Sequence, residues 1–218
     1  MNSWIVCKKC KGQGKKSRKL TKDVRQILQK GVSQIKKNTS EDLASINLKR
    51  HLYACKTCKG SGLIISEASP SANKNLYPNL AIIGGGIAGV ALAVACLHRS
   101  IPFTLYERDT NFEARSQGYG LTLQQASKSL KGFGLFKLHQ GVVSSRHVVH
   151  TTEGKVIGEW GMRKWMPTTE ASALKSSNIH ISRQALRLEL LNQLGGHNFV
   201  KWDHKLVALQ KDTTKGVK

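Results

Sequence analysis

The stretch from Asn79 to Asp109, NLAIIGGGIAGVALAVACLHRSIPFTLYERD, decides the fold. A short apolar run is followed by a glycine-rich segment, a long apolar run of helical character and a second β-like run. Gly84, Gly86 and Gly89 form G-x-G-x-x-G. Glu107, whose carboxylate can accept hydrogen bonds from ribose hydroxyls, ends the second β-like run. This order of strand, glycine turn, helix and acid-ended strand is typical of a unit that binds an adenine dinucleotide. We therefore expect an α/β fold with a Rossmann-like domain.

The three glycines have different tasks in such a turn. Gly84 permits the tight turn after the strand, and Gly86 lets the backbone approach the pyrophosphate. Gly89 lets the helix pack against the sheet. Ile87 and Ala88 lie at the expected helix N-terminus, where free N–H groups and the helix dipole favour a phosphate.

Two other interpretations of this stretch are a membrane-spanning helix and a Rossmann unit that serves structure alone. Residues 79–97 are nearly all apolar, and their number approaches the roughly 20 that a bilayer requires. Three consecutive glycines and the return to β-like sequence at 102–106 fit a βαβ unit better. We therefore favour a bound dinucleotide.

Two later segments bear on which dinucleotide binds. Glu113 to Leu135 reads EARSQGYGLTLQQASKSLKGFGL, with an arginine, a Gly-x-Gly and a closing Gly-Leu. Asn178 to Leu194 reads NIHISRQALRLELLNQL and contains Arg-x-x-Leu-x-x-x-Leu. Together with the glycine motif and Glu107-Arg108, they resemble the FAD-dependent aromatic-ring monooxygenases of the para-hydroxybenzoate hydroxylase group. The resemblance covers about residues 78–210.

The resemblance implies FAD as the cofactor, and it also implies which residues of this chain bind that cofactor. Gly84 to Gly89 and Glu107-Arg108 match the motif residues around the pyrophosphate and ribose. Arg115 matches an arginine near the flavin side, and Arg183 matches one that contacts the cofactor from the substrate-sheet side. Both arginines also fit solvated surface positions, which are the default in a chain with 35 Lys plus Arg.

By the same resemblance, the expected activity is hydroxylation of an aromatic or similar small molecule, with molecular oxygen and NAD(P)H as co-substrates. The protein would orient the flavin and shield it from water, while the chemistry belongs to the cofactor. No catalytic residue is assigned, because the residues that contact substrate in this family are expected to lie mostly beyond Lys218. His147, His150 and His180 are expected to be ordinary strand or loop histidines. An NAD-dependent reductase is an alternative, and Arg115 and Arg183 argue against it.

The segments around these motifs have patterns of regular structure. Ser145 to Trp160 alternates and turns at Glu153-Gly154, which predicts a β-hairpin. Ser182 is placed to cap a helix that begins at Arg183 and carries a leucine at every fourth position. Trp202 to Gln210 is predicted to be another strand.

Two motifs of the resembled family are not found in this sequence. One is an Asp-Gly segment implicated in FAD and NAD(P)H handling, and the other is a Gly-Asp segment whose Asp binds the flavin-side ribose. After residue 110 the Asp residues are Asp203 and Asp212, in other contexts. We therefore expect residues 78–218 to be the N-terminal part of a FAD-binding domain, truncated and inactive alone.

The amino-terminal region holds two copies of C-x-x-C-x-G-x-G. Cys7 and Cys10 form the first pair, and Cys55 and Cys58 form the second. Four thiolates are the usual ligand set of a structural zinc ion (Zn²⁺). The repeat resembles the zinc-binding repeat of DnaJ-type chaperones. Those proteins carry four copies, so their client-binding role is not carried over.

Disulfides and a thioredoxin-like redox pair are the alternatives for these cysteines. Cys96 is left without a pair and the first residues show no signal-peptide pattern, which favours a reducing intracellular compartment, the cytoplasm. A redox C-x-x-C normally adjoins a βαβ unit, and neither pair does. We therefore favour zinc.

The residues between the two cysteine pairs are predicted to form two helices. The first begins at Thr21, and the second begins at Thr39 or Ser40 and runs to Tyr53. The expected domains are a zinc module at 1–66 with this helical insertion, a linker at 67–77 and the FAD-binding part at 78–218.

The charge is unevenly distributed along the chain. Residues 1–60 contain 16 Lys plus Arg and 3 Asp plus Glu, in a chain of net charge +22. A basic module of this kind could bind nucleic acid or an acidic membrane surface, or could simply be solvated. The rival interpretation of the whole chain is thus a non-enzymatic binding protein, with the zinc module as its working part and a vestigial flavin domain.

Overall fold

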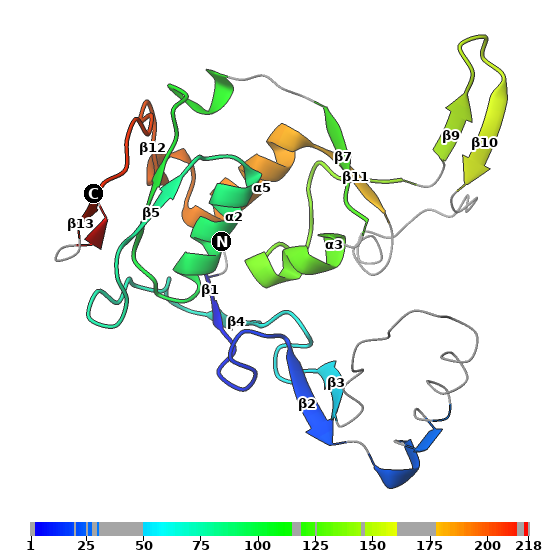
Figure 1. The fold of residues 1–218 in the computed structure, drawn as a ribbon, viewed down its shortest axis with the longest axis horizontal. Coiled ribbons are helices and arrows are strands. Elements are labelled where there is room, and N and C mark those ends of the chain that lie inside the picture. The colour runs from blue at the N-terminus through cyan, green and yellow to red at the C-terminus, as the bar shows by residue number, and fades with distance from the viewer. Residues whose placement is uncertain are drawn as a thin grey trace. The chain divides into compact units, whose positions relative to one another are not determined.

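A computed structural model describes residues 3–19, 21–24, 26–27, 30, 50–114, 119–124, 126–144, 147–160, 178–212 and 216–217. The chain divides into two compact units. One is Val6–Ile64, and the other joins Met1–Ile5 to Ile65–Lys218 (Figure 1). Within the part of the chain that is described, no helix has the length and apolar character needed to cross a bilayer.

The larger unit is built on the predicted βαβ arrangement. Strand β5 (Leu80–Ile83), helix α2 (Ile87–Leu97) and strand β6 (Phe103–Tyr106) follow one another, and the two strands pair in parallel. A third parallel strand, β12 (Val200–Lys201), pairs with the other edge of β6, which gives the order β12-β6-β5. The α/β expectation for this unit is confirmed.

Helix α5 (Arg183–Leu194) packs against α2 and supplies much of the core (Figure 1). The Ala185 N–H donates to the Ser182 hydroxyl over 3.1 Å, so the predicted cap is confirmed. Gly195 ends the helix with φ 97°, in the left-handed region that favours glycine. The leucines of α5 and the inner face of α2 fill one apolar cluster. Its fully buried members include Val90, Val94, Leu105, Leu190 and Leu191.

A second, antiparallel sheet contains β7 (Gly120–Thr122), β11 (Ile179–Ser182) and β8 (Val142–Val143), in the order β7-β11-β8. The predicted hairpin is present as β9 (His147–His150) and β10 (Val156–Trp160), which pair antiparallel. Short helices lie between β6 and β8: η1 (Phe112–Ala114), α3 (Ala126–Ser129) and η2 (Leu130–Phe133).

The predicted strand from Trp202 to Gln210 is wrong. Strand β12 ends at Lys201, and residues 202–210 contain no strand. The side chains of Leu206, Val207 and Leu209 lie in solvent, and Val207 is 89% exposed. Residues that favour a strand form one only where a partner strand and a core face are available. After this segment, β13 (Lys211–Asp212) and β14 (Gly216–Val217) pair with each other.

The smaller unit contains both cysteine pairs. Strand β2 (Lys15–Lys19) pairs antiparallel with β3 (Arg50–Ala54). Strands β1 (Ser3–Val6) and β4 (Leu63–Ser66) form another pair, and the division between the two units falls within both strands. The end of the second predicted helix is therefore wrong, because residues 50–53 belong to β3. Residues 22–24, 26–27 and 30 are helical, and the rest of the predicted helical insertion lies outside the described residues.

Candidate functional site

The glycine turn after β5 has the geometry that a dinucleotide site requires. Gly84 has φ 103°, where other residues are strained. A side chain at Gly89 would collide with the Gly84 carbonyl oxygen, and its Cβ would stand 3.5 Å from Ile82 Cγ2. In contrast, a Cβ at Gly86 would meet no atom within 4 Å. The helix thus packs closely on the turn, while the space beside Gly86 is open.

The N-terminus of α2 faces this turn. Gly86 is its N-cap in an extended conformation, and the Val90 N–H donates to the Gly86 carbonyl over 2.9 Å. Amides before Val90, such as those of Ile87 and Ala88, have no acceptor one turn earlier in the helix. These N–H groups and the positive end of the helix dipole can bind a phosphate.

Glu107 lies at the end of β6, against the turn. Its side chain is buried, with 8% exposure. The Gly85 N–H donates to Oε2 over 2.7 Å, and the Asp109 N–H donates to Oε1 over 3.2 Å. An ionised carboxylate has about four acceptor sites, so this group can hold the turn and still accept from a ribose hydroxyl. Arg108 is exposed beside it.

The two predicted cofactor arginines have different outcomes. Arg115 lies outside the described residues. Arg183 Nη1 donates to the Tyr119 hydroxyl over 2.8 Å, and its guanidinium lies 5.6 Å from the Tyr119 ring centroid. Its backbone N–H also donates to the Tyr119 carbonyl, so Arg183 is held at the edge of the β7–β11 sheet. No described contact joins Arg183 to Glu107 or to the glycine turn.

Arg187 contacts the turn instead, and the sequence did not predict it. Its Nε donates to the Gly85 carbonyl over 2.6 Å, and its side chain is only 7% exposed. One signal was available: Arg187 follows Leu186 on the apolar side of a helix, where an exposed arginine is not expected. A charged residue on a buried helix face has a partner in most structures.

The three histidines expected to be ordinary make local contacts. His147 lies 3.3 Å from the Ser144 hydroxyl, His150 lies 3.2 Å from the Gly154 carbonyl, and His180 lies 3.3 Å from the Thr122 hydroxyl. All three distances are between hydrogen-bonding atoms of strands or turns. These contacts suit structural roles.

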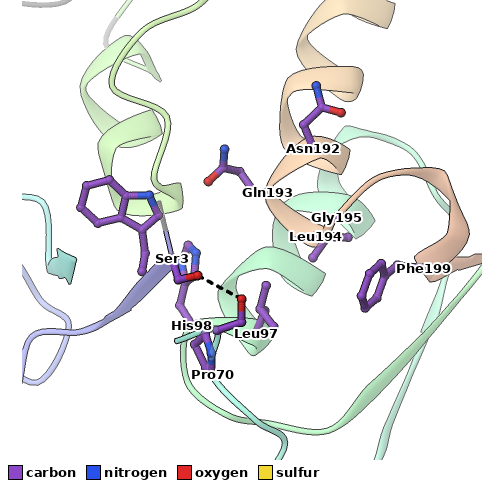
Figure 2. A pocket seen from close by; sticks show the side chains of 11 residues that line it. Ser3, Pro70, Leu97, His98, Asn192, Gln193, Leu194, Gly195 and Phe199 are labelled. Carbon is purple, nitrogen blue, oxygen red and sulfur yellow. Dashed lines mark hydrogen bonds between the residues drawn. The ribbon is translucent and has the colours of Figure 1, made fainter. Parts of the chain in front are cut away.

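A cavity of about 350 Å³ lies at the C-terminal ends of α2 and α5 (Figure 2). His98 and Phe199 line it, and Ser3 bonds Ser69 across 3.0 Å at its rim. Burial lowers the pKa of His98 to about 4, so its imidazole is neutral at pH 7. The cavity is at the opposite end of α2 from Gly86, so it is separate from the phosphate position.

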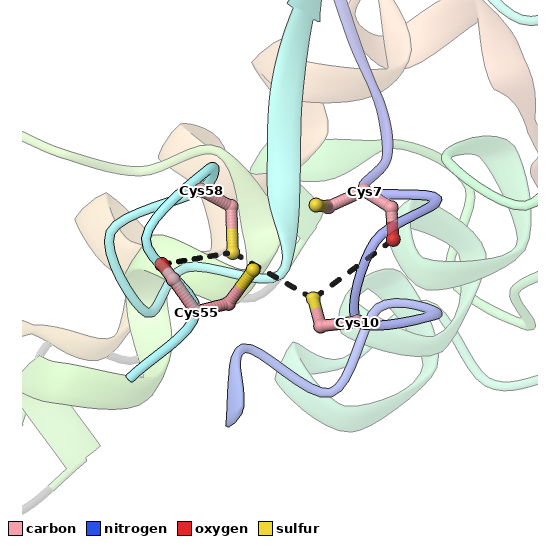
Figure 3. Close-up of side chains that lie close together, drawn as sticks. All are labelled: Cys7, Cys10, Cys55 and Cys58. Carbon is pink, nitrogen blue, oxygen red and sulfur yellow. Dashed lines mark hydrogen bonds between the residues drawn. The ribbon is translucent and has the colours of Figure 1, made fainter. Parts of the chain in front are cut away.

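The four predicted metal ligands come together in the smaller unit (Figure 3). All four cysteines are free thiols and buried, and their sulfur atoms lie within 4.8 Å of one another. The sulfurs of Cys10 and Cys58 are 3.7 Å apart, far beyond a disulfide bond. The four therefore form a compact cluster of separate sulfur ligands.

Glycines shape the two loops that hold these cysteines. Gly14 and Gly62 have φ 67° and 82°. A side chain at Gly14 would collide with the Gly60 carbonyl, and one at Gly62 would collide with the Gly12 carbonyl. The Gly62 N–H donates to Cys58 Sγ over 3.3 Å, as expected for a glycine that turns its amide toward a sulfur.

The environment of the cluster affects the thiols differently. The backbone N–H of Cys58 lowers the pKa of Cys55 to about 6. Burial raises the pKa of Cys10 to about 11. A buried cluster of four cysteine sulfurs is the donor set that a thiophilic cation such as Zn²⁺ stabilises as thiolates.

Comparison with known proteins supplies relatives for part of the chain. A dual O-methyltransferase/FAD-dependent monooxygenase of Cercospora beticola is 47% identical over 70 residues, which are 32% of this chain and 8% of the relative. An FAD-dependent monooxygenase of Monascus ruber is 50% identical over 44 residues, which are 20% of this chain and 10% of the relative. Part of this chain is similar to FAD-dependent monooxygenases. No protein-family model matches the chain.

Among solved structures, 2,6-dihydroxypyridine-3-hydroxylase from Arthrobacter nicotinovorans superposes with a TM-score of 0.48 and 20% identity. The superposition covers 62% of this chain and 31% of that enzyme. The chain thus spans about a tenth of the length of the curated relatives and about a third of this structure. The sequence relatives confirm that part of this chain is similar to FAD-dependent monooxygenases, and the DnaJ-type resemblance stays a prediction.

The residues around Gly86 fit the adenine-dinucleotide part of FAD. The turn leaves open space where the pyrophosphate would approach, and a side chain at Gly89 cannot be accommodated. Helix amides face the same place, and the buried Glu107 carboxylate stands beside it. These are the three features that FAD binding at this turn requires.

Proposed function

We propose that this chain provides the dinucleotide-binding part of a flavin- and NAD(P)H-dependent monooxygenase that hydroxylates an aromatic or similar small molecule. The observation that carries the proposal is the open space at Gly86. Helix α2 packs closely on the turn at Gly89, and the buried Glu107 carboxylate lies beside the turn. The relatives named FAD-dependent monooxygenases support the choice of FAD.

The residues of this chain would divide the binding of FAD among them. The amides of Gly86, Ile87 and Ala88 would bind the pyrophosphate at the start of α2. Glu107 would accept hydrogen bonds from the ribose of the adenosine half. Arg183, Arg115 and Arg108 carry charges that suit the phosphate and flavin side.

Bound FAD would supply the redox chemistry: NAD(P)H gives two electrons, one atom of O₂ enters the substrate, and the other leaves as water. The turn and α2 would hold the dinucleotide part of the cofactor in place. His147, His150 and His180 are engaged in local contacts. For this reason we assign no proton-transfer step to any of them.

Titration of the purified chain with FAD tests this proposal. We expect quenching of flavin fluorescence with one FAD per chain, and no comparable binding of NAD. Binding of NAD alone would favour the reductase alternative and overturn the proposal. Oxidation of NAD(P)H with formation of a hydroxylated product would also contradict the expectation that this chain alone is inactive.

We propose further that Cys7, Cys10, Cys55 and Cys58 hold one structural Zn²⁺. Four buried sulfurs within 4.8 Å of one another support it. Elemental analysis should give one zinc per chain, and Co²⁺ substitution should give the spectrum of a tetrahedral thiolate site. A protein purified under reducing conditions without metal, yet with an intact smaller unit, would refute it.

A second candidate function is binding of nucleic acid by the smaller unit. The observation that favours it is charge: the described segments 3–19 and 50–66 contain ten Lys and Arg and no acidic residue. Binding to a labelled DNA duplex should weaken steeply with salt. It should also weaken in a Lys15→Glu/Lys19→Glu variant, but not in a Lys155→Glu/Lys205→Glu control. A colourless, zinc-containing protein that binds duplex would favour this candidate over the first.

A further inference from the structure

Two buried charged side chains hold Gly85 from opposite sides. Glu107 accepts from the Gly85 N–H over 2.7 Å, and Arg187 donates to the Gly85 carbonyl over 2.6 Å. Glu107 comes from the end of β6, and Arg187 comes from the middle of α5. The residue between the first and second glycines of the motif is therefore fixed by two other elements.

These two bonds act on two different peptide groups. The Gly85 N–H belongs to the peptide that joins Gly84 to Gly85. The Gly85 carbonyl belongs to the next peptide, which also contains the Gly86 N–H. In a trans peptide the carbonyl and the N–H point in opposite directions. Because Arg187 draws the Gly85 carbonyl toward α5, the Gly86 N–H must point away from α5.

Gly86 is the position at which the turn is open. A Cβ there would meet no atom within 4 Å, and no described residue accepts a hydrogen bond from its N–H. The bond from Arg187 thus leaves the Gly86 amide free to donate on the side away from α5. A phosphate oxygen is the acceptor that a turn of this kind recruits.

The surroundings of Arg187 keep its guanidinium in place. Its Cζ lies 4.9 Å from the Phe112 ring centroid and 5.4 Å from the Trp202 ring centroid. Its Nη1 donates to Gln184 Oε1 over 3.4 Å. Contacts with two aromatic rings favour a desolvated guanidinium over an ammonium, because arginine is more weakly hydrated and presents a planar face.

We propose that Arg187 is a positioning residue of the dinucleotide turn. It orients the peptide between Gly85 and Gly86 so that the Gly86 N–H is presented to the pyrophosphate, while Glu107 fixes the preceding peptide. Arg187 also places a positive charge behind the turn, which adds to the positive end of α2. This inference rests on the proposed binding of FAD.

Arg187→Met tests the role, because methionine fills similar volume without the donor or the charge. We expect FAD to bind about 10- to 100-fold more weakly, as for loss of a hydrogen bond from a charged donor. Arg99→Met is the matched control: Arg99 is exposed just past the far end of α2, and its guanidinium donates to the Ala95 carbonyl. It removes the same charge and should leave FAD affinity within about twofold.

Amide hydrogen exchange in the FAD-free protein separates positioning from packing. In Arg187→Met the turn loses one of its two side-chain anchors, so the Gly85 amide, which Glu107 alone then holds, should exchange faster, while the amides of Val90 and Val94 in α2 stay as slow as in wild type. Equal acceleration of Gly85 and of those core amides would show a packing role only and would overturn the proposal. Unchanged FAD affinity together with unchanged Gly85 exchange would also overturn it.

Arg187→Lys keeps the experiment decisive if the methionine variant does not fold. Lysine retains the charge but not the planar group that contacts Phe112 and Trp202, so we expect FAD affinity between wild type and Arg187→Met. A lysine variant whose FAD affinity falls while its Gly85 exchange stays as in wild type would contradict the proposal. If the wild-type chain itself does not bind FAD, the proposed function fails, and the exchange data alone decide the role of Arg187.

Discussion

The carbonyl oxygen of Gly84 occupies the space in which a side chain at Gly89 would stand. This close approach brings the first turn of α2 directly against the end of β5. It also explains why two glycines of the motif have unlike requirements. Position 89 requires glycine because a side chain there would collide with the Gly84 carbonyl, whereas the space beside Gly86 is empty in the folded chain.

Gly89→Ala and Gly86→Ala should therefore fail in different ways. Gly89→Ala should unfold the larger unit or destabilise it by about 1–3 kcal/mol, because the added methyl group overpacks the turn. Gly86→Ala should fold normally, since its φ is −72° and a Cβ has room, yet should bind FAD poorly. Urea unfolding and FAD titration of both variants check this. A Gly86→Ala protein with full FAD affinity would contradict the assignment of the open turn to the pyrophosphate.

Glu107→Gln should weaken FAD binding by about tenfold, because a hydrogen bond from ribose to a charged acceptor becomes one to a neutral amide. The variant should lose about 1 kcal/mol of stability, since the glutamine oxygen can still accept from the Gly85 N–H but its NH2 group cannot accept from the Asp109 N–H. Glu113→Gln removes the same charge from an exposed position and is the control. Fluorescence titration gives both affinities. Equal losses in the two variants would indicate a general charge effect rather than a ribose contact.

Ser182→Ala should destabilise the larger unit by about 1 kcal/mol, because the Ala185 N–H loses its acceptor at the start of α5. Ser129→Ala is the matched control, since Ser129 caps η2 without a side-chain hydrogen bond. It should change the free energy of unfolding by less than about 0.5 kcal/mol. Denaturant unfolding of the two variants measures the difference. Equal effects would mean that the Ser182 cap contributes nothing.

Local patterns predicted the parts of the fold that local chemistry controls. The βαβ unit was predictable because the need for glycine arises within the turn itself. Helix α5 was predictable from its cap and its leucine spacing. Strand β3 was missed because it exists through pairing with Lys15–Lys19, across an insertion of helical pattern. The strand expected at 202–210 has no partner among the described residues.

In the candidate site, too, the parts that depend on local sequence were predictable. The four cysteines are close together because their spacing and glycines dictate two similar loops. Glu107 could be placed because it follows the second strand of the motif. The contact of Arg187 with Gly85 joins residues 102 positions apart, and it depends on how α5 packs on α2. The separation of these two residues along the sequence therefore gives no sign that they are in contact.

Removal of metal should affect the two compact units unequally. Chelation, or Cys58→Ser, should unfold Val6–Ile64, because in small Cys₄ units the free energy of metal binding is the free energy of folding. The exchange protection of α2 and α5 should remain. Cys96→Ala is the control, since Cys96 is buried in α2 and outside the cluster, and it should retain one zinc. Hydrogen exchange before and after chelation tests this. Full protection of Val6–Ile64 without metal would refute a structural metal.

The stability of the larger unit should fall with acid because of His98. Burial, with a smaller effect of Arg99, lowers its pKa from 6.5 to about 4 in the folded chain. Between these values the unfolded chain binds a proton that the folded chain does not, so the free energy of unfolding decreases as the pH falls from about 6.5 to about 4. The loss should reach about 3 kcal/mol by about pH 4. His98→Gln lacks this titration and should show a shallower slope in urea unfolding across that range. Parallel slopes for wild type and variant would show that His98 is already protonated, or solvated, in the folded protein.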